Sequence, residues 1–281
     1  MKLRWFLATL LVGLSCRSNL TAQAVSDMSG APPKFFLIVR ESLKTGKAAL
    51  ENAIEIDSMH TCVRMKCPNT YLAATTVTGA GQAWWFTPFD SYAEFEKVSA
   101  AYAQNPALAS EIARMVERKA DLLTVPPNGV IVEYQSDLSQ IAGTDFSHAH
   151  YLSITTVRVA PGQDGEFGQL RKMERTTHEK LGLKCSHFVY EVVSGAPDHQ
   201  YLVITPLQSL AAAEQEPVLH GQRHEKLSDE KDLATVRQLT SVAIVSSETD
   251  LFTPNPTWSY LPKSWIAADP DFWDAAGVRN P

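Results

Sequence analysis

The sequence has few cysteines, no excess of basic residues, and no long apolar run beyond its first two dozen residues. Its 281 residues include four cysteines, and 25 Lys and Arg stand against 31 Asp and Glu, a formal net charge of -6. An acidic chain without a basic stripe argues against nucleic acid and against an anionic membrane surface as partners. A glycine-rich phosphate loop, a Ser/His/Asp pattern and a CxxC pair are also missing, which excludes the commonest catalytic signatures.

The N-terminus has the pattern of a signal peptide covering residues 1–24. Lys2 and Arg4 precede a short apolar run, and Ala22-Gln23-Ala24 supplies the small residues that a signal peptidase recognises. We therefore expect a secreted or periplasmic protein that is not membrane-bound after cleavage. A retained anchor and lipidation at Cys16 remain open as alternatives.

Three cysteines remain after that cleavage, so at most one internal disulfide can form. Cys62 and Cys67 are five positions apart, a poor spacing for a bridge on one helix, where neighbours are three or four apart. Cys67 can pair with Cys185 only if the fold brings the two together. The interpretation favoured by the sequence is that these cysteines are small buried residues.

One eight-residue pattern occurs twice. HTCVRMKC runs from His60 to Cys67, and HEKLGLKC runs from His178 to Cys185, so each copy has a histidine and, after six residues, a cysteine preceded by lysine. Nearby turns recur at almost the same offset, including Thr-Pro at positions 87–88 and again at 205–206. The chain therefore reads as two versions of one unit.

Each predicted unit has the order strand, helix, strand, strand, helix, strand. We expect strands at 35–43, 71–78, 83–87 and 130–134 in the first unit, and at 151–159, 188–193, 200–205 and 241–246 in the second. Ser91 and Glu94 form a predicted capping box at a helix start. The domains are then a first ferredoxin-like unit at 34–135, a linker at 136–149, a second unit at 150–250, and an irregular tail at 251–281 rich in proline and tryptophan.

The predicted fold class is α+β, because one such unit leaves a sheet face bare and two units can join their sheets into a barrel. Tandem units of this length with a Trp-rich third strand resemble the dimeric α+β barrel superfamily, which includes antibiotic-biosynthesis-type monooxygenases and NIPSNAP-like proteins. The resemblance covers residues 34–250 and implies a small-molecule cleft between helices and sheet in each unit. It implies no single activity, since fold does not settle function.

His60 and His178 are candidate acid/base groups or ligands, because a histidine titrates near neutral pH. The alternative is that each caps a helix end, where the helix dipole favours a positive charge. Cys67 and Cys185 are candidate nucleophiles beside these histidines, with buried packing as the alternative. No carboxylate recurs in both units beside the two histidines.

Two further histidine pairs have the spacing of metal ligands. His220 and His224 are four apart on a predicted helix, which places both rings on one face, and His148 and His150 open the second unit. The HExxH order is absent, because Glu225 lies outside the first pair. The alternative is four surface histidines, and the sequence predicts no bound metal and no cofactor.

Aromatic residues concentrate in the first unit. Trp84 and Trp85 are consecutive on a predicted strand, so they point to opposite faces, one toward the helices and one toward the barrel interior. With Tyr71 and Tyr92 they are either core residues or the wall of a pocket for a flat apolar molecule.

The sequence thus supports an exported protein of undetermined activity that binds a small apolar or aromatic molecule in an α+β barrel cleft. The first alternative is a cofactor-independent monooxygenase or isomerase that uses His60 or His178. The second is a structural or interaction protein that uses its Trp-rich tail, in which Trp258, Trp265 and Trp273 lie among four prolines.

Overall fold

The computed structural model describes residues 31–214 and 230–274. The strands of this part are β1 Phe35–Ser42, β2 Leu72–Thr76, β3 Gln82–Phe89, β4 Asn128–Tyr134, β5 Tyr151–Val159, β6 Phe188–Ser194, β7 Gln200–Leu207 and β8 Ile244–Pro254. The helices are α1 Ala48–Met65, α2 Tyr92–Ala103, α3 Pro106–Ala120, α4 Asp164–Lys180, α5 Leu210–Ala213, α7 Glu230–Ala243, α8 Lys263–Ala268 and α9 Pro270–Trp273. Two 3-10 turns, η1 Ser136–Leu138 and η2 Phe146–His148, lie between the halves. The predicted signal peptide lies outside the described residues.

The strands close into one barrel in the order β1-β3-β2-β8-β5-β7-β6-β4, and every neighbouring pair is antiparallel. Both halves place their strands in the same way, with the fourth strand beside the first, then the third, then the second. The halves join where β2 pairs with β8 and β4 pairs with β6. Closure leaves no open sheet edge, and the predicted α+β barrel-like fold is confirmed.

Apolar side chains fill the barrel interior. They include Phe36, Phe86, Tyr190 and Phe252, none of which is more than 2% exposed. Because alternate residues of each strand point inward, the strands supply one continuous core. The barrel is therefore solid, and space for a ligand has to be sought on its outer face, beneath the helices.

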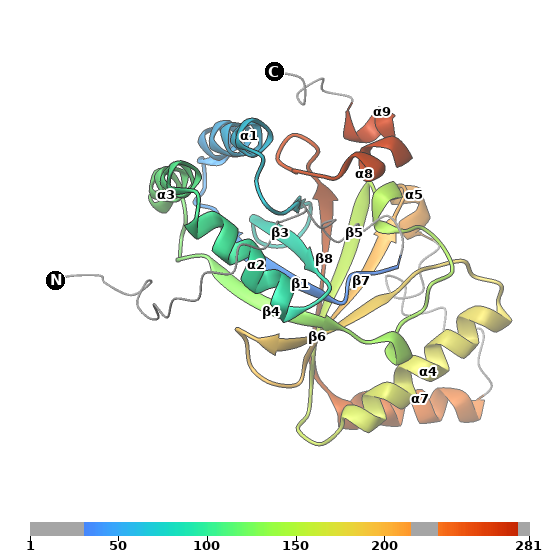
Figure 1. Ribbon diagram of the computed structural model, residues 1–281. Coiled ribbons are helices and arrows are strands. Elements are labelled where there is room, and N and C mark those ends of the chain that lie inside the picture. Colours follow the sequence, from blue (N-terminus) through green and yellow to red (C-terminus); the bar gives the residue numbers. More distant parts are fainter. Residues whose placement is uncertain (1–30, 215–229, 275–281) are drawn as a thin grey trace.

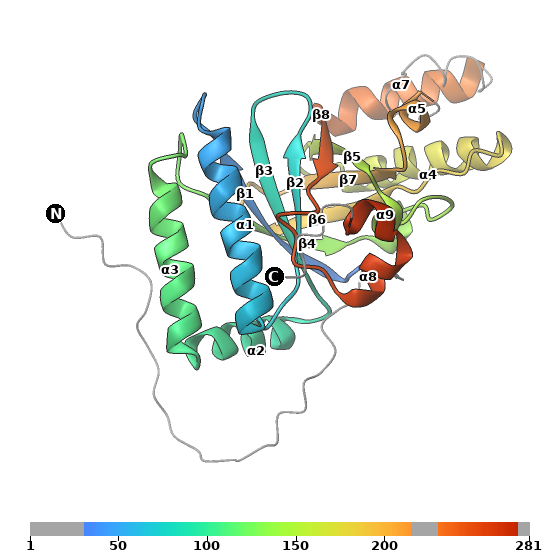
Figure 2. The ribbon, with the colours of Figure 1, turned by 90° about the horizontal axis from the view of Figure 1, so that it is seen from above.

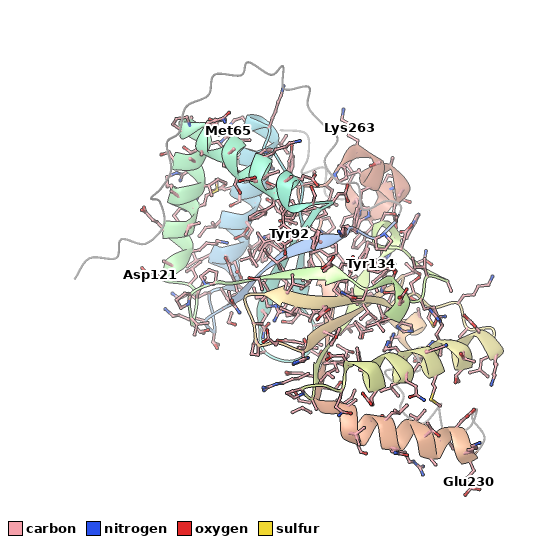
Figure 3. The ribbon with its side chains drawn as sticks, turned by 60° about the horizontal axis from the view of Figure 1, so that its bottom comes forward. Met65, Tyr92, Asp121, Tyr134, Glu230 and Lys263 are labelled. Carbon is pink, nitrogen blue, oxygen red and sulfur yellow. A yellow bond between two sulfur atoms is a disulfide. The ribbon has the colours of Figure 1, made fainter. Side chains whose placement is uncertain are left out.

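Helices cover the outer face of the barrel on two sides. Helices α1 and α3 lie side by side over the first half, and α4 and α7 pack against each other over the second (Figures 1 and 2). Figure 3 shows Glu230, at the start of α7, far from the barrel. The predicted capping box is present at α2, where Ser91 Oγ accepts the Glu94 N–H (3.1 Å) and Glu94 Oε2 accepts the Asp90 N–H (2.7 Å).

The end of the chain departs from the prediction in two ways. The closing strand was expected at 241–246, but α7 continues to Ala243 and β8 runs on to Pro254. The strand is long because it pairs with β5 along its length and with β2 of the other half at its end, a contact that no local pattern encodes. The tail after β8 is also not wholly irregular, since it contains α8 and α9.

The cysteines of the first half form a disulfide, which corrects the sequence-based expectation. Cys62 is bonded to Cys67, and their Cα atoms are 4.6 Å apart. The helix ends at Met65, and Lys66 then takes a left-handed conformation with φ 54°. That turn brings Cys67 back onto Cys62, so the spacing rule for an unbroken helix does not apply. Cys185 is buried and is not part of a disulfide.

Candidate functional site

Two histidines and a cysteine come together beneath the helices that cover the second half of the barrel. His178 lies in the last turn of α4, Cys185 in the segment that follows, and His187 immediately before β6. One ligand atom from each residue lies within 4.8 Å of the others, and all three side chains are buried. Cys185 Sγ is 3.6 Å from His178 Nδ1, and the two imidazole centroids are 5.2 Å apart. We refer to these three residues as the His/Cys cluster.

A tight reversal after α4 brings the cysteine to the histidine. The Leu183 N–H donates to the His178 carbonyl oxygen (3.0 Å), and Gly182 has φ 64°, a conformation that glycine adopts without steric cost. The chain then runs back toward the sheet. The thiol of Cys185 therefore faces the imidazole of His178, which lies before this turn at the end of α4.

Residues from two other segments fix the imidazoles. Gln140, in the connection between the halves, exchanges backbone hydrogen bonds with His187 in both directions (3.0 and 2.8 Å). Its side-chain Oε1 lies 3.1 Å from His178 Nδ1. From β7, Thr205 Oγ1 lies 2.8 Å from His187 Nδ1. With Thr205 as acceptor, His187 carries its proton on Nδ1 and its lone pair on Nε2.

The surroundings of His187 favour its uncharged form. Burial lowers the pKa of His187 well below its usual range, and the charges of Arg171 and His178 act in the same direction. Arg171 is buried on α4 and forms an ion pair with Glu174 on the same helix. A neutral imidazole is the form that accepts a proton or binds a metal ion. His187 is therefore suited to either role.

A recess opens next to the cluster. Its accessible volume is about 90 Å³, and the described residues that line it are Thr144, Leu183, Lys184, Cys185, Ser186, Pro206, Leu207 and Ala212. Cys185 belongs both to this lining and to the His/Cys cluster. Cys185 thus lies between the buried imidazoles and this recess, which has room for a few water-sized groups.

The first half has a different group of polar residues beneath its helices. Lys119 of α3 places Nζ 2.8 Å from Glu41 Oε1 of β1 and 2.9 Å from Glu55 Oε1 of α1. The same ammonium lies 4.6 Å from the centre of the Trp85 ring. Glu51 is buried on α1, and its Oε1 has no hydrogen-bond partner among the described residues.

The charges of this group are strongly coupled. Burial on its own lowers the pKa of Lys119, but the carboxylates of Glu55 and Glu41 outweigh it, so the net shift is upward and the ammonium stays charged. Burial raises the pKa of Glu51 to about 7, and the neighbouring carboxylates of Glu55 and Glu41 add to the rise. We interpret the group as a buried ion network that ties α1 and α3 to the sheet, because the ammonium of α3 bridges carboxylates of α1 and β1.

The predicted catalytic candidates fall in different places. His178 and Cys185 meet, as the nucleophile hypothesis required. His60 lies within α1 on the opposite side of the barrel, so the two histidines do not share a site. The hypothesis that Cys67 acts as a nucleophile is wrong, because its sulfur is bonded to Cys62.

The four predicted aromatic ligand-binding residues do not line one pocket. Trp84 lies inside the barrel and Trp85 outside it, against Trp258, as strand alternation predicted. Tyr71 packs against Tyr260 (ring centroids 6.3 Å apart). Tyr92 borders a small apolar hollow of about 10 Å³, which is lined by Phe35, Leu37, Phe89, Ser91, Tyr92, Phe95 and Ile131.

The His148 and His150 pair does not add ligands to the cluster. His148 Nδ1 is 2.8 Å from Asp145, and His150 Nε2 is 2.8 Å from Asp269. Each therefore has its own carboxylate partner. His220 and His224 lie outside the described residues, so their proposed metal site stays a prediction.

Sequence reasoning missed His187, Gln140 and Thr205. Cys185 and His187 are two apart at the start of a strand, and residues at this spacing point to the same face. That spacing could have identified His187 as a neighbour of Cys185. Gln140 and Thr205 gave no such signal, because their contacts depend on how the connection and β7 are placed in space.

Comparison with solved structures shows two chains of the same fold. A provisionally named monooxygenase of Fusobacterium nucleatum subsp. nucleatum is 11% identical, with a TM-score of 0.52 over 78% of this chain and 91% of that one. An anthrone oxidase-like protein is 13% identical, with a TM-score of 0.51 over 80% of this chain and 92% of that one. These chains are of the dimeric α+β barrel type, and at this identity the likeness establishes the fold alone. No protein-family model matches the sequence, and no curated protein does.

Within residues 31–214 and 230–274, no helix combines the length and the apolar character needed to cross a membrane.

Proposed function

We propose that this protein binds a small organic molecule in the recess beside Cys185. The observation that carries the proposal is the double position of Cys185, which lines a recess with an accessible volume of about 90 Å³ and whose sulfur lies 3.6 Å from an imidazole nitrogen. The lining mixes apolar side chains, such as Leu207, with the hydroxyls of Thr144 and Ser186. A ligand with an apolar body and a polar group fits this mixture.

The disulfide between Cys62 and Cys67 supports export of the protein, because such bonds persist in oxidising compartments. The Trp-rich tail is less suited to a partner-binding role. Trp265 and Trp273 are at most 1% exposed within their own chain, which leaves little of either ring for another protein.

The proposal is tested by filling the recess. Ala212→Trp on α5 should remove the thermal stabilisation that apolar and phenolic compounds give the wild-type protein, and those compounds should slow alkylation of Cys185 by iodoacetamide. Ala211→Trp is the matched control, since Ala211 is exposed on the same short helix. Equal ligand responses in the two tryptophan variants would contradict the proposed site.

A second candidate is a cofactor-independent monooxygenase or isomerase, favoured by the thiol–imidazole contact and by the kind of fold. In this reading a His178 nitrogen takes a proton from an activated carbon acid or phenol held in the recess. Oxygen uptake with phenolic and anthrone-like compounds measures such turnover. His178→Gln should abolish it and His60→Gln should not; turnover that survives His178→Gln would rule out this role.

A further inference from the structure

We propose that His178, Cys185 and His187 form a binding site for a thiophilic transition-metal ion, with Zn²⁺ as the reference ion. The site shares Cys185 with the recess but does not depend on a small molecule binding there. Its three donors are two imidazole nitrogens and a sulfur, a set that suits zinc and copper and does not suit magnesium or calcium.

The separations between the donors are close to those of a metal site. Zinc binds sulfur at about 2.3 Å and imidazole nitrogen at about 2.0 Å, which places neighbouring donors of a tetrahedral ion roughly 3.5 Å apart. Sγ and His178 Nδ1 are already 3.6 Å apart. No two of the three donors are more than 4.8 Å apart, so the remaining donors close on the ion by about 1 Å through small side-chain rotations.

The outer contact of His187 has the form that metal-binding histidines require. A ligating imidazole is held by a hydrogen bond at its other nitrogen, which fixes the ring and its tautomer. Thr205 Oγ1 holds His187 Nδ1 at 2.8 Å, so the proposed donor of His187 is Nε2. Gln140 Oε1 lies 3.1 Å from His178 Nδ1, the nitrogen that faces Cys185 Sγ, so metal binding at Nδ1 displaces that hydrogen bond.

Thiolate formation offsets half of the charge of a divalent ion at this site. Binding replaces the thiol proton with the metal: the S–H bond breaks, a metal–sulfur bond forms, and the proton passes to solvent. Arg171 and Glu174 form an ion pair and largely cancel each other. A divalent ion with one thiolate then leaves one net positive charge. With three protein donors and Cys185 at the edge of the recess, the site has room for a further ligand, which is typical of catalytic zinc centres.

The first half of the chain provides the internal control. At the same offset of 118 residues, the positions equivalent to His178, Cys185 and His187 hold His60, Cys67 and Asn69. The sulfur of Cys67 is bonded to Cys62 in the disulfide, and Asn69 Oδ1 accepts a hydrogen bond from the Tyr102 hydroxyl (2.9 Å). Of these two positions, only Cys185 is outside a disulfide, and it lies close to two imidazoles.

The test uses the untagged mature protein after removal of metal. Wild-type protein should take up one equivalent of Zn²⁺ in competition with a chromophoric chelator, and Co²⁺ should produce a thiolate-to-cobalt charge-transfer band. Cys185→Ser and His187→Ala should each abolish the tight site, and Thr205→Val should weaken it by about 10-fold, as loss of an outer-shell contact does. His60→Ala should bind like the wild-type protein.

Two outcomes overturn the metal site: folded wild-type protein that shows no thiolate-to-cobalt band, or Zn²⁺ affinity unchanged in His187→Ala. If His187→Ala does not fold, the wild-type cobalt spectrum and Thr205→Val decide the question. Ala212→Trp separates the two proposals, because it should retain the metal while it loses the small molecule. Loss of small-molecule binding alone therefore contradicts the recess and leaves the metal site standing.

Discussion

Lys119 Nζ lies 2.9 Å from Glu55 Oε1, and their side chains are 14% and 3% exposed. The same ammonium is hydrogen-bonded to Glu41, so one lysine neutralises carboxylates from a helix and from a strand. Removing a single partner of a buried ion group leaves uncompensated charge in a poorly solvated space. The ammonium is consequently the centre of the attachment of α1 and α3 to the barrel.

We predict that Lys119→Met lowers the free energy of unfolding by about 3–5 kcal/mol at neutral pH. Urea unfolding followed by tryptophan fluorescence measures the loss. The control is Arg118→Ala, which removes an ion pair with the half-exposed Asp57 (3.0 Å) and should cost about 0–1 kcal/mol. Similar losses in the two variants would contradict a special role for the buried group.

The protonation of Glu51 predicts a pH dependence of stability. Its pKa is raised from an ordinary value of 4.5 to about 7, chiefly by burial, with Glu55 and Glu41 adding to the rise and Lys119 opposing it. Between these two pH values the folded state holds more protons than the unfolded state, so this residue makes stability fall as pH rises through that window. Above the folded pKa its contribution is constant.

Glu51→Gln should therefore remove part of the decrease in stability between pH 5 and pH 8, roughly 1–2 kcal/mol. Comparing urea unfolding of the variant and the wild type at the two pH values isolates this residue from other groups that titrate in the same range. Glu96→Gln, on the exposed face of α2, is the control and should follow the wild type. If Glu51→Gln lost as much stability between pH 5 and pH 8 as the wild type does, the assignment of this pH dependence to Glu51 would be refuted.

The disulfide between Cys62 and Cys67 closes a short loop, which limits how much it stabilises the folded protein. In the chain-entropy account a loop of this size contributes roughly 2 kcal/mol. The double variant Cys62→Ser, Cys67→Ser should lose about that amount, and reductant should affect the wild type but not the variant. Peptide mass mapping without reduction should find these two cysteines linked and Cys185 alkylatable after unfolding.

Local patterns in the sequence predicted the parts of the fold that depend on neighbouring residues. The capping box at Ser91 and Glu94, the opposite orientations of Trp84 and Trp85, and the order of elements in both halves follow from residues close in the chain. The long β8 did not, because its last residues pair with β2, far away in sequence. The disulfide was missed because it depends on the left-handed turn at Lys66.

The candidate site was only half predictable for the same reason. The repeated pattern drew attention to His178 and Cys185, which a single helix end and turn bring together. His187 is held in place by Gln140 and Thr205, from the connection and from β7. Those contacts arise from the packing of three segments, so no spacing along the chain encodes all of them.

The tail places two indoles at one end of the barrel core, and the two differ in their hydrogen bonding. Trp265 and Trp273 lie with ring centroids 5.6 Å apart and are at most 1% exposed. Trp273 Nε1 donates to the Ser147 carbonyl oxygen (2.7 Å), whereas Trp265 Nε1 is buried without a hydrogen-bond partner among the described residues. The tail is thus part of the hydrophobic core, and its two rings allow a matched test.

Truncating either ring to alanine should cost about 3–5 kcal/mol of unfolding free energy, because it leaves a large cavity in a packed core. Replacement by phenylalanine should separate the two positions. Trp273→Phe leaves the Ser147 carbonyl without its donor and should cost about 1 kcal/mol more than Trp265→Phe, in which no such bond is lost. Urea unfolding of the four variants measures these differences, with Lys263→Ala as an exposed control on the same segment. Alanine variants as stable as that control would mean that the tail is not packed into the core, since loss of a buried indole cannot be neutral there.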